Sequence, residues 1–203
     1  ALKLTTSSQA GVVSAFVPLM VTIGAYVTLR EPLGRRSIIG ISISLFGVTV
    51  LTLMQGEEGH ALNPYIGNTL ELLAMACAAG NMLIIKKLSS RYNPWALTAM
   101  QIFGGTVFFL PGLWFLIQTP AAHFSPGLTM IIVYLGIGVT LGAFGCYNWG
   151  MSRMPAGHAS AFINLVPVFA VFFGWGVMGD VLSIAQWLAV MAVIGGIWFG
   201  LKT

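Results

Sequence analysis

The sequence is poor in charge. Only 7% of its 203 residues are Asp, Glu, Lys or Arg, whereas a soluble domain typically carries about 25%. In addition, 57% of the residues are hydrophobic and the mean hydropathy is +0.90, so the chain cannot cover a folded surface that faces water. These values exclude a soluble globular protein and favour a chain whose solvent is lipid.

Cysteine is also scarce. Cys77 and Cys146 fall in apolar stretches without metal-ligand spacing, so we interpret them as small buried hydrophobic residues and expect no metal site or cofactor. The first eight residues lack a charged segment followed by an apolar core, so we expect no signal peptide in them. They resemble the end of a helix, and we therefore expect the sequence to be truncated at its N-terminus.

Basic residues are few and scattered. The net charge is +4, but the nine Lys and Arg residues lie singly or in pairs between apolar runs. This spacing is typical of membrane-orientation signals and not of a phosphate-binding patch, so we expect no nucleic-acid partner.

The sequence does contain long apolar stretches. Seven of them are long enough to cross a bilayer as a helix, for which about 20 residues are needed. Short connections rich in Gly and Pro separate them, as helix boundaries require. We predict helices over residues 11–29, 37–54, 65–85, 95–117, 127–150, 157–178 and 184–201. The fold class is therefore an all-α, multi-pass integral membrane protein.

The connections differ in charge when they are assigned alternately to the two sides. One side holds Arg30, Arg35, Arg36, Lys86, Lys87, Arg91, Arg153 and Lys202, and the other holds Lys3. Because Lys and Arg accumulate on the cytoplasmic side, we expect the C-terminus in the cytoplasm and Glu57, Glu58 and His60 outside. The expected location is a plasma membrane, which in a bacterium is the inner membrane.

Small residues recur at four-residue spacing, which places them on one face of a helix. The pairs are Gly40/Ser44, Gly138/Gly142 and Gly196/Gly200. Such pairs let helix backbones approach closely in lipid. We therefore expect a tightly packed helical bundle.

The sequence contains an internal repeat with an offset of 149 residues. This offset superposes Pro18 on Pro167, Glu31 on Asp180 and Gly47 on Gly196. The predicted orientation puts Glu31 on the inner side and Asp180 on the outer side, so the two copies are inverted. Inverted repeats are typical of secondary transporters, in which two halves rock about a central site.

Particular residues of both copies resemble one family. They are Ser7-Ser8-Gln9-Ala10, Pro18, Glu31-Pro32-Leu33 and residues 40–47 in the first copy, and Tyr147-Asn148-Trp149, residues 156–160, Pro167, Gly179-Asp180, Leu182 and Gly195-Gly196 in the second. This pattern is similar to the EamA-like family of the drug/metabolite transporter superfamily. One departure is Asp180, where the family pattern usually has Glu.

The resemblance implies a bundle of ten helices in two inverted five-helix repeats, with both termini cytoplasmic and a solute cavity between the halves. Residues 1–55 would be the C-terminal part of the first repeat, 56–64 an extracytoplasmic linker and 65–203 a complete second repeat. The chain would thus supply helices four to ten. Without the first three helices one side of the cavity would be open, so we do not expect the chain alone to be active.

Glu71 is the most distinctive candidate for a functional side chain. It lies about two turns inside the outer end of its predicted helix. A carboxylate within the bilayer is costly and should face the bundle interior or a wet cavity, where burial favours the protonated form that proton coupling needs. The alternative is a carboxylate that reaches outward to water at the interface.

Other polar side chains in the helices are candidates for a solute cavity, and the set is Asn81, Gln101, Asn148, Trp149, His158 and Asn164. Amides in hydrocarbon need partners, so hydrogen bonding between helices is the alternative for each amide. Asn164 could instead bond the carbonyl that Pro167 leaves without a partner. His158 could titrate during transport or serve as a helix cap, and an aromatic belt at the interface would equally explain Trp149.

The two matched prolines, Pro18 and Pro167, are candidates for helix hinges, with a packing kink as the alternative. Glu31 and Asp180 end the same two helices, and each is expected to cap the helix that follows.

The predicted function is a secondary transporter, expected to be an exporter, of a small metabolite, an amino acid-like solute or an amphipathic compound. It would work by alternating access, and coupling of solute transport to proton movement is one option. Its partners would be this solute and the lipid bilayer, and a homodimer is an open option. A passive channel and a membrane scaffold are the alternatives. We do not expect an enzyme, because the single aspartate and the unclustered histidines form no intramembrane protease or metal site.

Overall fold

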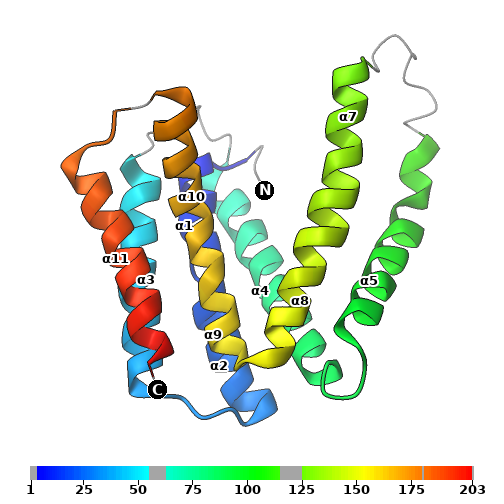
Figure 1. Ribbon diagram of the computed structural model, residues 1–203, viewed down its shortest axis with the longest axis horizontal. Helices are drawn as coiled ribbons and strands as arrows, with labels where there is room; N and C mark the ends of the chain where they lie inside the picture. The colour runs from blue at the N-terminus through cyan, green and yellow to red at the C-terminus, as the bar shows by residue number, and fades with distance from the viewer. Residues whose placement is uncertain (1–3, 55–62, 115–124, 180, 203) are drawn as a thin grey trace. The chain divides into compact units, whose positions relative to one another are not determined.

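The computed structural model describes residues 4–54, 63–114, 125–179 and 181–202. The described chain is helical and contains no strand (Figure 1). Its helices are α1 (Ser7–Ser14), α2 (Val17–Leu29), α3 (Arg35–Met54), α4 (Pro64–Leu88), α5 (Pro94–Phe109), η1 (Leu110–Gly112), α7 (Pro126–Tyr134), η3 (Leu135–Ala143), α8 (Phe144–Arg153), α9 (Ala156–Ala161), η4 (Phe162–Asn164), α10 (Leu165–Phe173), η5 (Gly174–Met178) and α11 (Ile184–Leu201). Lys3, Glu57, Glu58, His60 and Asp180 lie outside the described residues.

These helices form seven stretches that are long and apolar enough to cross a membrane. Within the described residues they are Ser8–Leu29, Arg35–Met54, Pro64–Leu88, Pro94–Gly112, Pro126–Arg153, Ala156–Val177 and Ile184–Leu201. The prediction of seven spans is confirmed, and most boundaries differ from it by one to three residues. The sidedness of the C-terminus stays a prediction.

Local capping explains where several helices begin. Asn93 accepts a hydrogen bond from the backbone N–H of Trp95 ahead of Pro94, and Ser125 does the same for Leu128 ahead of Pro126. Proline suits a first helical position because its missing N–H would have no partner there. Ser183 and Gln186 form a reciprocal capping box at the start of α11.

The chain divides into two compact units, and the division falls within α4. The first unit contains residues 1–84 and 154–203, and the second contains residues 85–153.

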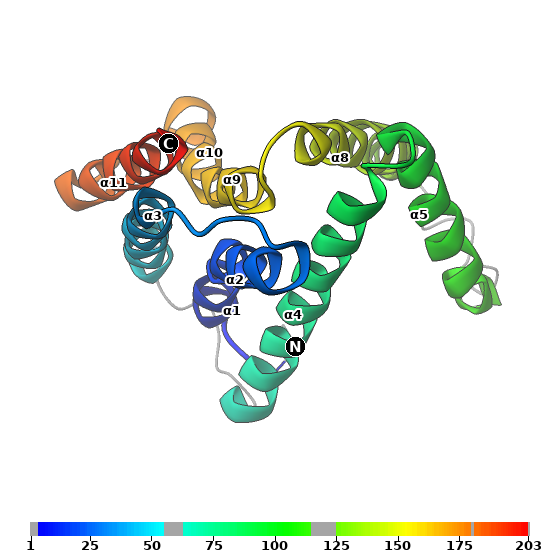
Figure 2. The same cartoon turned by 90° about the horizontal axis from the view of Figure 1, so that it is seen from below.

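The first unit is built on a close pair of helices, α3 and α11, which lie side by side in both views (Figures 1 and 2). A Cβ added at Gly196 would lie 2.7 Å from the carbonyl oxygen of Gly40 and 2.7 Å from the backbone nitrogen of Ser44. The predicted close approach of helices at Gly40 and Gly196 is therefore confirmed. The buried core beside this contact includes Leu51 and Val193, both fully inaccessible.

The second unit contains α5, η1, α7, η3 and α8, with the last four residues of α4. The ring of Trp95 on α5 packs against Gly145 on α8. A Cβ added at Gly138 or Gly142 would meet only atoms of its own helical segment, from Tyr134 and Ile137 respectively. The prediction of a close helix contact at this pair is therefore wrong within the described residues.

Both cysteines are exposed in the structure, so the prediction that they are buried is also wrong. Apolar residues cover both the inside and the outside of a helical bundle in lipid, and a thiol is weakly polar. Hydropathy alone therefore does not separate a core position from a lipid-facing one.

Candidate functional site

Two helices of the first unit are broken at equivalent points of the repeat. In the first copy, α1 ends at Ser14 and α2 begins at Val17, directly before the buried Pro18. In the second copy, the 3-10 turn η4 separates α9 from α10, which contains Pro167. The starts of α1 and α9, Ser7 and Ala156, are also 149 residues apart. The interruptions support the sequence match, while the hinge role of both prolines stays a prediction.

A cavity of about 280 Å³ lies where these two broken helices meet α3. The residues that line it are Gly11, Ser14, Ala15, Val48, Thr52, Ile163, Asn164, Val166, Pro167 and Ala170. Most are apolar, and the polar exceptions are Ser14, Thr52 and Asn164. The two copies of the repeat thus share one cavity, which we call the repeat cavity.

Asn164 is fixed across the wall of the repeat cavity. Its Nδ2 donates to Ser44 Oγ on α3 at 2.9 Å, and both side chains are buried. The structure thus shows a hydrogen bond between helices at Asn164, which was one of its two structural alternatives. A role in solute binding stays a prediction.

Glu71 is linked to the same cavity by Ser14, which contacts the Glu71 carboxyl group and lines the cavity. The Glu71 side chain is only 9% exposed, and its Oε1 lies 3.4 Å from Ser14 Oγ, which also donates to the carbonyl oxygen of Ala10 at 2.8 Å. Ser14 lines the repeat cavity, so one hydroxyl group connects the carboxyl group with the cavity. The side chain is thus buried between α4 and α1, as expected of a carboxyl group that faces the bundle interior.

Further polar side chains continue along the same contact between α1 and α4. Asn68, one helical turn before Glu71, donates from Nδ2 to Gln9 Oε1 at 3.1 Å, and the hydroxyl of Thr5 contacts both of these side chains. Positions i and i+3 share a helix face, so Asn68 and Glu71 form one polar strip on α4.

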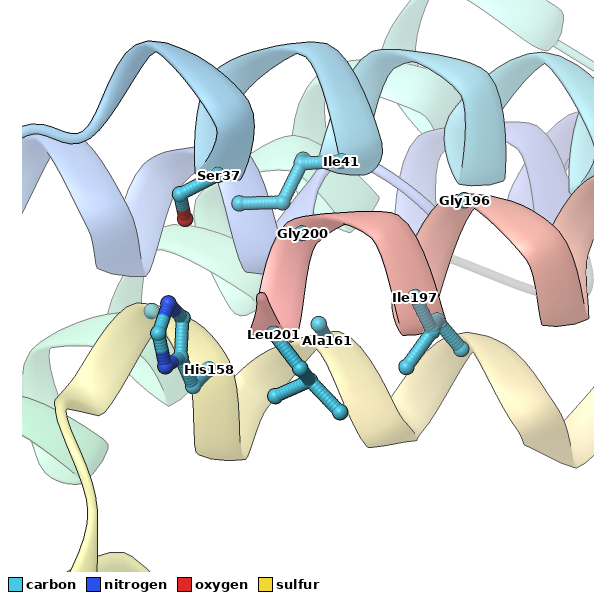
Figure 3. Close-up of a pocket in the computed structure, with 9 residues that line it drawn as sticks. Ser37, Ile41, His158, Ala161, Gly196, Ile197, Gly200 and Leu201 are labelled. Carbon is cyan, nitrogen blue, oxygen red and sulfur yellow. The ribbon is translucent and has the colours of Figure 1, made fainter. Parts of the chain in front are cut away.

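His158 lies away from the repeat cavity. It borders a pocket of about 10 Å³, which is about the space of one water molecule. Figure 3 shows the imidazole ring at the edge of this pocket, with Ser37 of α3 and Leu201 of α11 across from it. The structure therefore does not bring His158 together with Glu71 or Asn164.

Glu31 caps a helix that is distant in sequence. Its Oε2 accepts a hydrogen bond of 2.8 Å from the backbone N–H of Ala156 at the start of α9. The structure thus shows Glu31 as a cap of α9, while the expected capping of α3 stays a prediction. The residue before it, Arg30, has a left-handed backbone with φ of 57° that ends α2 and turns the chain at this point.

The second unit contains its own buried polar group. Asn148 is 3% exposed, and its Nδ2 donates to Thr98 Oγ1 at 2.9 Å and to Gln101 Oε1 at 2.7 Å. These bonds join α8 to α5. Two of the predicted cavity residues, Gln101 and Asn148, are therefore in direct contact.

A cavity of about 380 Å³ lies beside this group, and we call it the hairpin cavity. It is lined by Thr98, Gln101, Ile102, Gly105, Thr106, Phe109, Thr140 and Phe144. Thr140 belongs to η3, a π-helical segment in which its hydroxyl donates to the carbonyl oxygen of Leu135 at 2.9 Å. π-Helical turns are rare and often occur at functional sites.

The two remaining candidates line neither cavity. Trp149 is 47% exposed, and the guanidinium of Arg153 lies 5.1 Å from its ring centroid. Asn81 is also exposed. Sequence analysis missed Ser14, Ser44, Thr52 and Thr98, because serine and threonine are common in membrane helices and carry no signal of their own.

The comparisons with known proteins agree with this architecture. The model of the EamA-like transporter family matches residues 1–53 and 65–201. A solved crystal structure superposes with a TM-score of 0.79 and 21% sequence identity, over 99% of this chain and 70% of that one. The chain therefore has the same fold as that protein.

Several curated relatives are similar over nearly the whole chain. The uncharacterized transporter YetK of Bacillus subtilis is 26% identical over 202 residues, which cover 97% of this chain and 60% of that protein. An uncharacterized transporter of Archaeoglobus fulgidus is 29% identical, over 95% of this chain and 67% of its own. An S-adenosylmethionine/S-adenosylhomocysteine transporter of Chlamydia trachomatis is 27% identical, over 88% and 57% respectively.

This chain spans about three fifths of the length of YetK and of the Chlamydia relative. Membership follows from the family match, which covers both copies of the repeat. The resemblance to the drug/metabolite transporter superfamily is thus confirmed. The chain belongs to the EamA-like transporter family.

Proposed function

We propose that this protein is a secondary transporter that moves a small metabolite or amphipathic solute across a plasma membrane by alternating access. The observation that carries the proposal is the repeat cavity, where two interrupted helices that run in opposite directions line one space. Helices interrupted at the membrane midplane are typical of transporter binding sites. The relatives that are named transporters support the same class.

The solute is a small molecule in this proposal. The repeat cavity has three polar side chains in an apolar lining, which is the composition of a small-molecule site. A relative is named for S-adenosylmethionine and S-adenosylhomocysteine, and both are small metabolites with a polar and an apolar part. Export is the direction we expect.

Glu71 is the proposed proton carrier. Its carboxyl group is buried against Ser14, and Ser14 lines the repeat cavity, so a proton on Glu71 and a solute in the cavity would each change the surroundings of the same hydroxyl group. Occupation of the cavity and protonation of the carboxyl group would then be linked, which is what coupling requires.

The test uses the full-length protein in proteoliposomes with an imposed pH gradient, with uptake of candidate solutes as the measurement. Glu71→Gln should abolish the gradient-driven part of the flux while expression stays unchanged. Glu31→Gln is the matched control, because Glu31 lies in a connection and an amide oxygen can still accept from Ala156. Gradient-driven flux that persists in Glu71→Gln would rule out the proton role.

The same liposomes distinguish a carrier from a passive channel. A carrier exchanges labelled external solute for unlabelled internal solute, so it accumulates label transiently without any gradient of protons. A channel only equilibrates the label. Absence of counterflow together with rapid equilibration would replace the proposal with the channel alternative.

A further inference from the structure

The hairpin cavity of the second unit has a distinctive chemistry. Three of its lining residues are threonines, on α5 and η3. A hydroxyl group has one hydrogen to donate and two lone pairs to accept with. Whether each threonine can donate a hydrogen bond to a ligand, or only accept one, therefore depends on whether its hydroxyl hydrogen already has an acceptor.

All three threonines donate to their own helix. Thr98 Oγ1 donates to the carbonyl oxygen of Pro94 at 2.9 Å, Thr106 Oγ1 to that of Ile102 at 2.8 Å, and Thr140 Oγ1 to that of Leu135 at 2.9 Å. Thr98 also accepts from Asn148. Toward a ligand these oxygens are thus hydrogen-bond acceptors.

Among the described residues, the lining contains no Lys, Arg or His. A carboxylate would therefore have no cationic side chain beside it in the part of the cavity that the structure describes, where Gln101 is the one lining side chain with N–H groups. An ammonium group, in contrast, carries N–H donors that suit neutral oxygens, and Thr106 and Thr140 supply one such oxygen from each of the two helical segments. Thr98 lies two turns before Thr106, about 12 Å along α5, so it does not share the same ammonium group. Neutral oxygens alone can replace the hydration shell of a cation in membrane proteins.

The rest of the cavity suits an aromatic or aliphatic body. Phe109 and Phe144 line it, and each presents a ring that attracts cations through its face. The volume of about 380 Å³ lies within the range of about 300–1,000 Å³ that is usual for small-molecule sites.

We propose that the hairpin cavity binds the protonated amine of a small amphipathic compound, with the oxygens of Thr106 and Thr140 as acceptors and the two phenyl rings around its apolar part. This inference rests on the proposed function for its biological meaning, since the amine would be a transported solute. It selects amines over carboxylates and over compounds without a polar head.

The experiment measures binding by isothermal titration calorimetry to the purified protein in nanodiscs of zwitterionic lipid, with empty nanodiscs as the blank. Three probes share a phenyl ring and differ in the end group, and they are 2-phenylethylamine, 3-phenylpropionate and propylbenzene. We expect 2-phenylethylamine to bind at least tenfold more tightly than either of the others.

The variants test the threonine oxygens directly. Thr106→Val and Thr140→Val keep the shape of the side chain and should each weaken amine binding by about tenfold, the effect of a lost hydrogen bond to a charged group. Thr106→Ser and Thr140→Ser keep the oxygen and should retain binding. Thr129→Val is the matched control, since Thr129 also donates to its own helix and does not line the cavity.

Equal affinity for the three probes would overturn the inference and identify the cavity as an apolar lipid-facing groove. Valine variants that bind like the unmodified protein would overturn it as well. The binding measurement needs no gradient and no flux, so it can fail while transport is demonstrated, or succeed while transport is not.

Discussion

The helices within the first unit are held together differently from those within the second. In the first unit, 44% of the 18-residue apolar window of Arg35–Met54 is buried. In the second unit, none of the equivalent window of Pro126–Arg153 is buried. The first unit is stabilised by close backbone contact between α3 and α11. The second has a buried amide that bonds two side chains of the facing helix.

The difference follows from the physics of helices in lipid. Apolar side chains gain little by moving from lipid to a helix contact, so association depends on close packing of small residues or on hydrogen bonds. The first unit uses both means, since Asn164 and Ser44 lie near its glycine contact, and the second relies more on hydrogen bonds. Each means can be removed by one substitution.

The largest effect is expected from a methyl group in the glycine contact. Gly196→Ala places a Cβ against backbone atoms of Gly40 and Ser44, which cannot yield as a flexible side chain would, so we expect a loss of about 1–3 kcal/mol in unfolding free energy. Gly195→Ala is the matched control, because nothing lies within 4 Å of its added Cβ. Unfolding in mixed detergent micelles measures both, and equal stabilities would refute the close contact.

An intermediate effect is expected in the second unit. Asn148→Leu removes two hydrogen bonds and leaves Thr98 and Gln101 with an apolar neighbour, so we expect a loss of about 1–2 kcal/mol. Thr129→Val is the control, since Thr129 is exposed and its hydroxyl bonds its own helix in the same unit. Protection of the α5 and α8 amides from hydrogen exchange should fall in Asn148→Leu and stay high in α3 and α11. A uniform loss across both units would contradict two separately stabilised units.

Much of the fold could be predicted from the sequence because the signals are local. Apolar length located all seven spans, and the match of Pro18 with Pro167 located two equivalent interruptions. The pairs Gly40/Ser44 and Gly138/Gly142 share one spacing, yet only the first contacts another helix within the described residues. Spacing on one helix carries no information about which partner lies opposite.

The candidate sites were harder to predict, because they depend on contacts between distant residues. Glu71 and Asn148 were detectable as rare polar types within apolar helices. Their neighbours Ser14 and Thr98 were not, since their role comes from residues 57 and 50 positions away. The capping partner of Glu31 is 125 residues away, and the π-helical segment η3 has no sequence pattern that distinguishes it from an α-helix.

The smallest effect tests the hydrogen bond of the first unit by itself. Asn164 and Ser44 form one bond between the repeat copies, so a double-mutant cycle of Asn164→Ala and Ser44→Ala should give a coupling energy of about 0.6 kcal/mol, the average for such bonds in a membrane protein. This is less than the effect expected at Asn148, because a single partner is lost instead of two. Detergent unfolding of the four proteins gives the coupling, and the pair Asn164→Ala with Thr49→Ala is the control, since Thr49 bonds its own helix. A coupling near zero would mean that packing at Gly40 and Gly196 alone joins the copies, whereas a value above that of Asn148 would reverse the comparison between the two units.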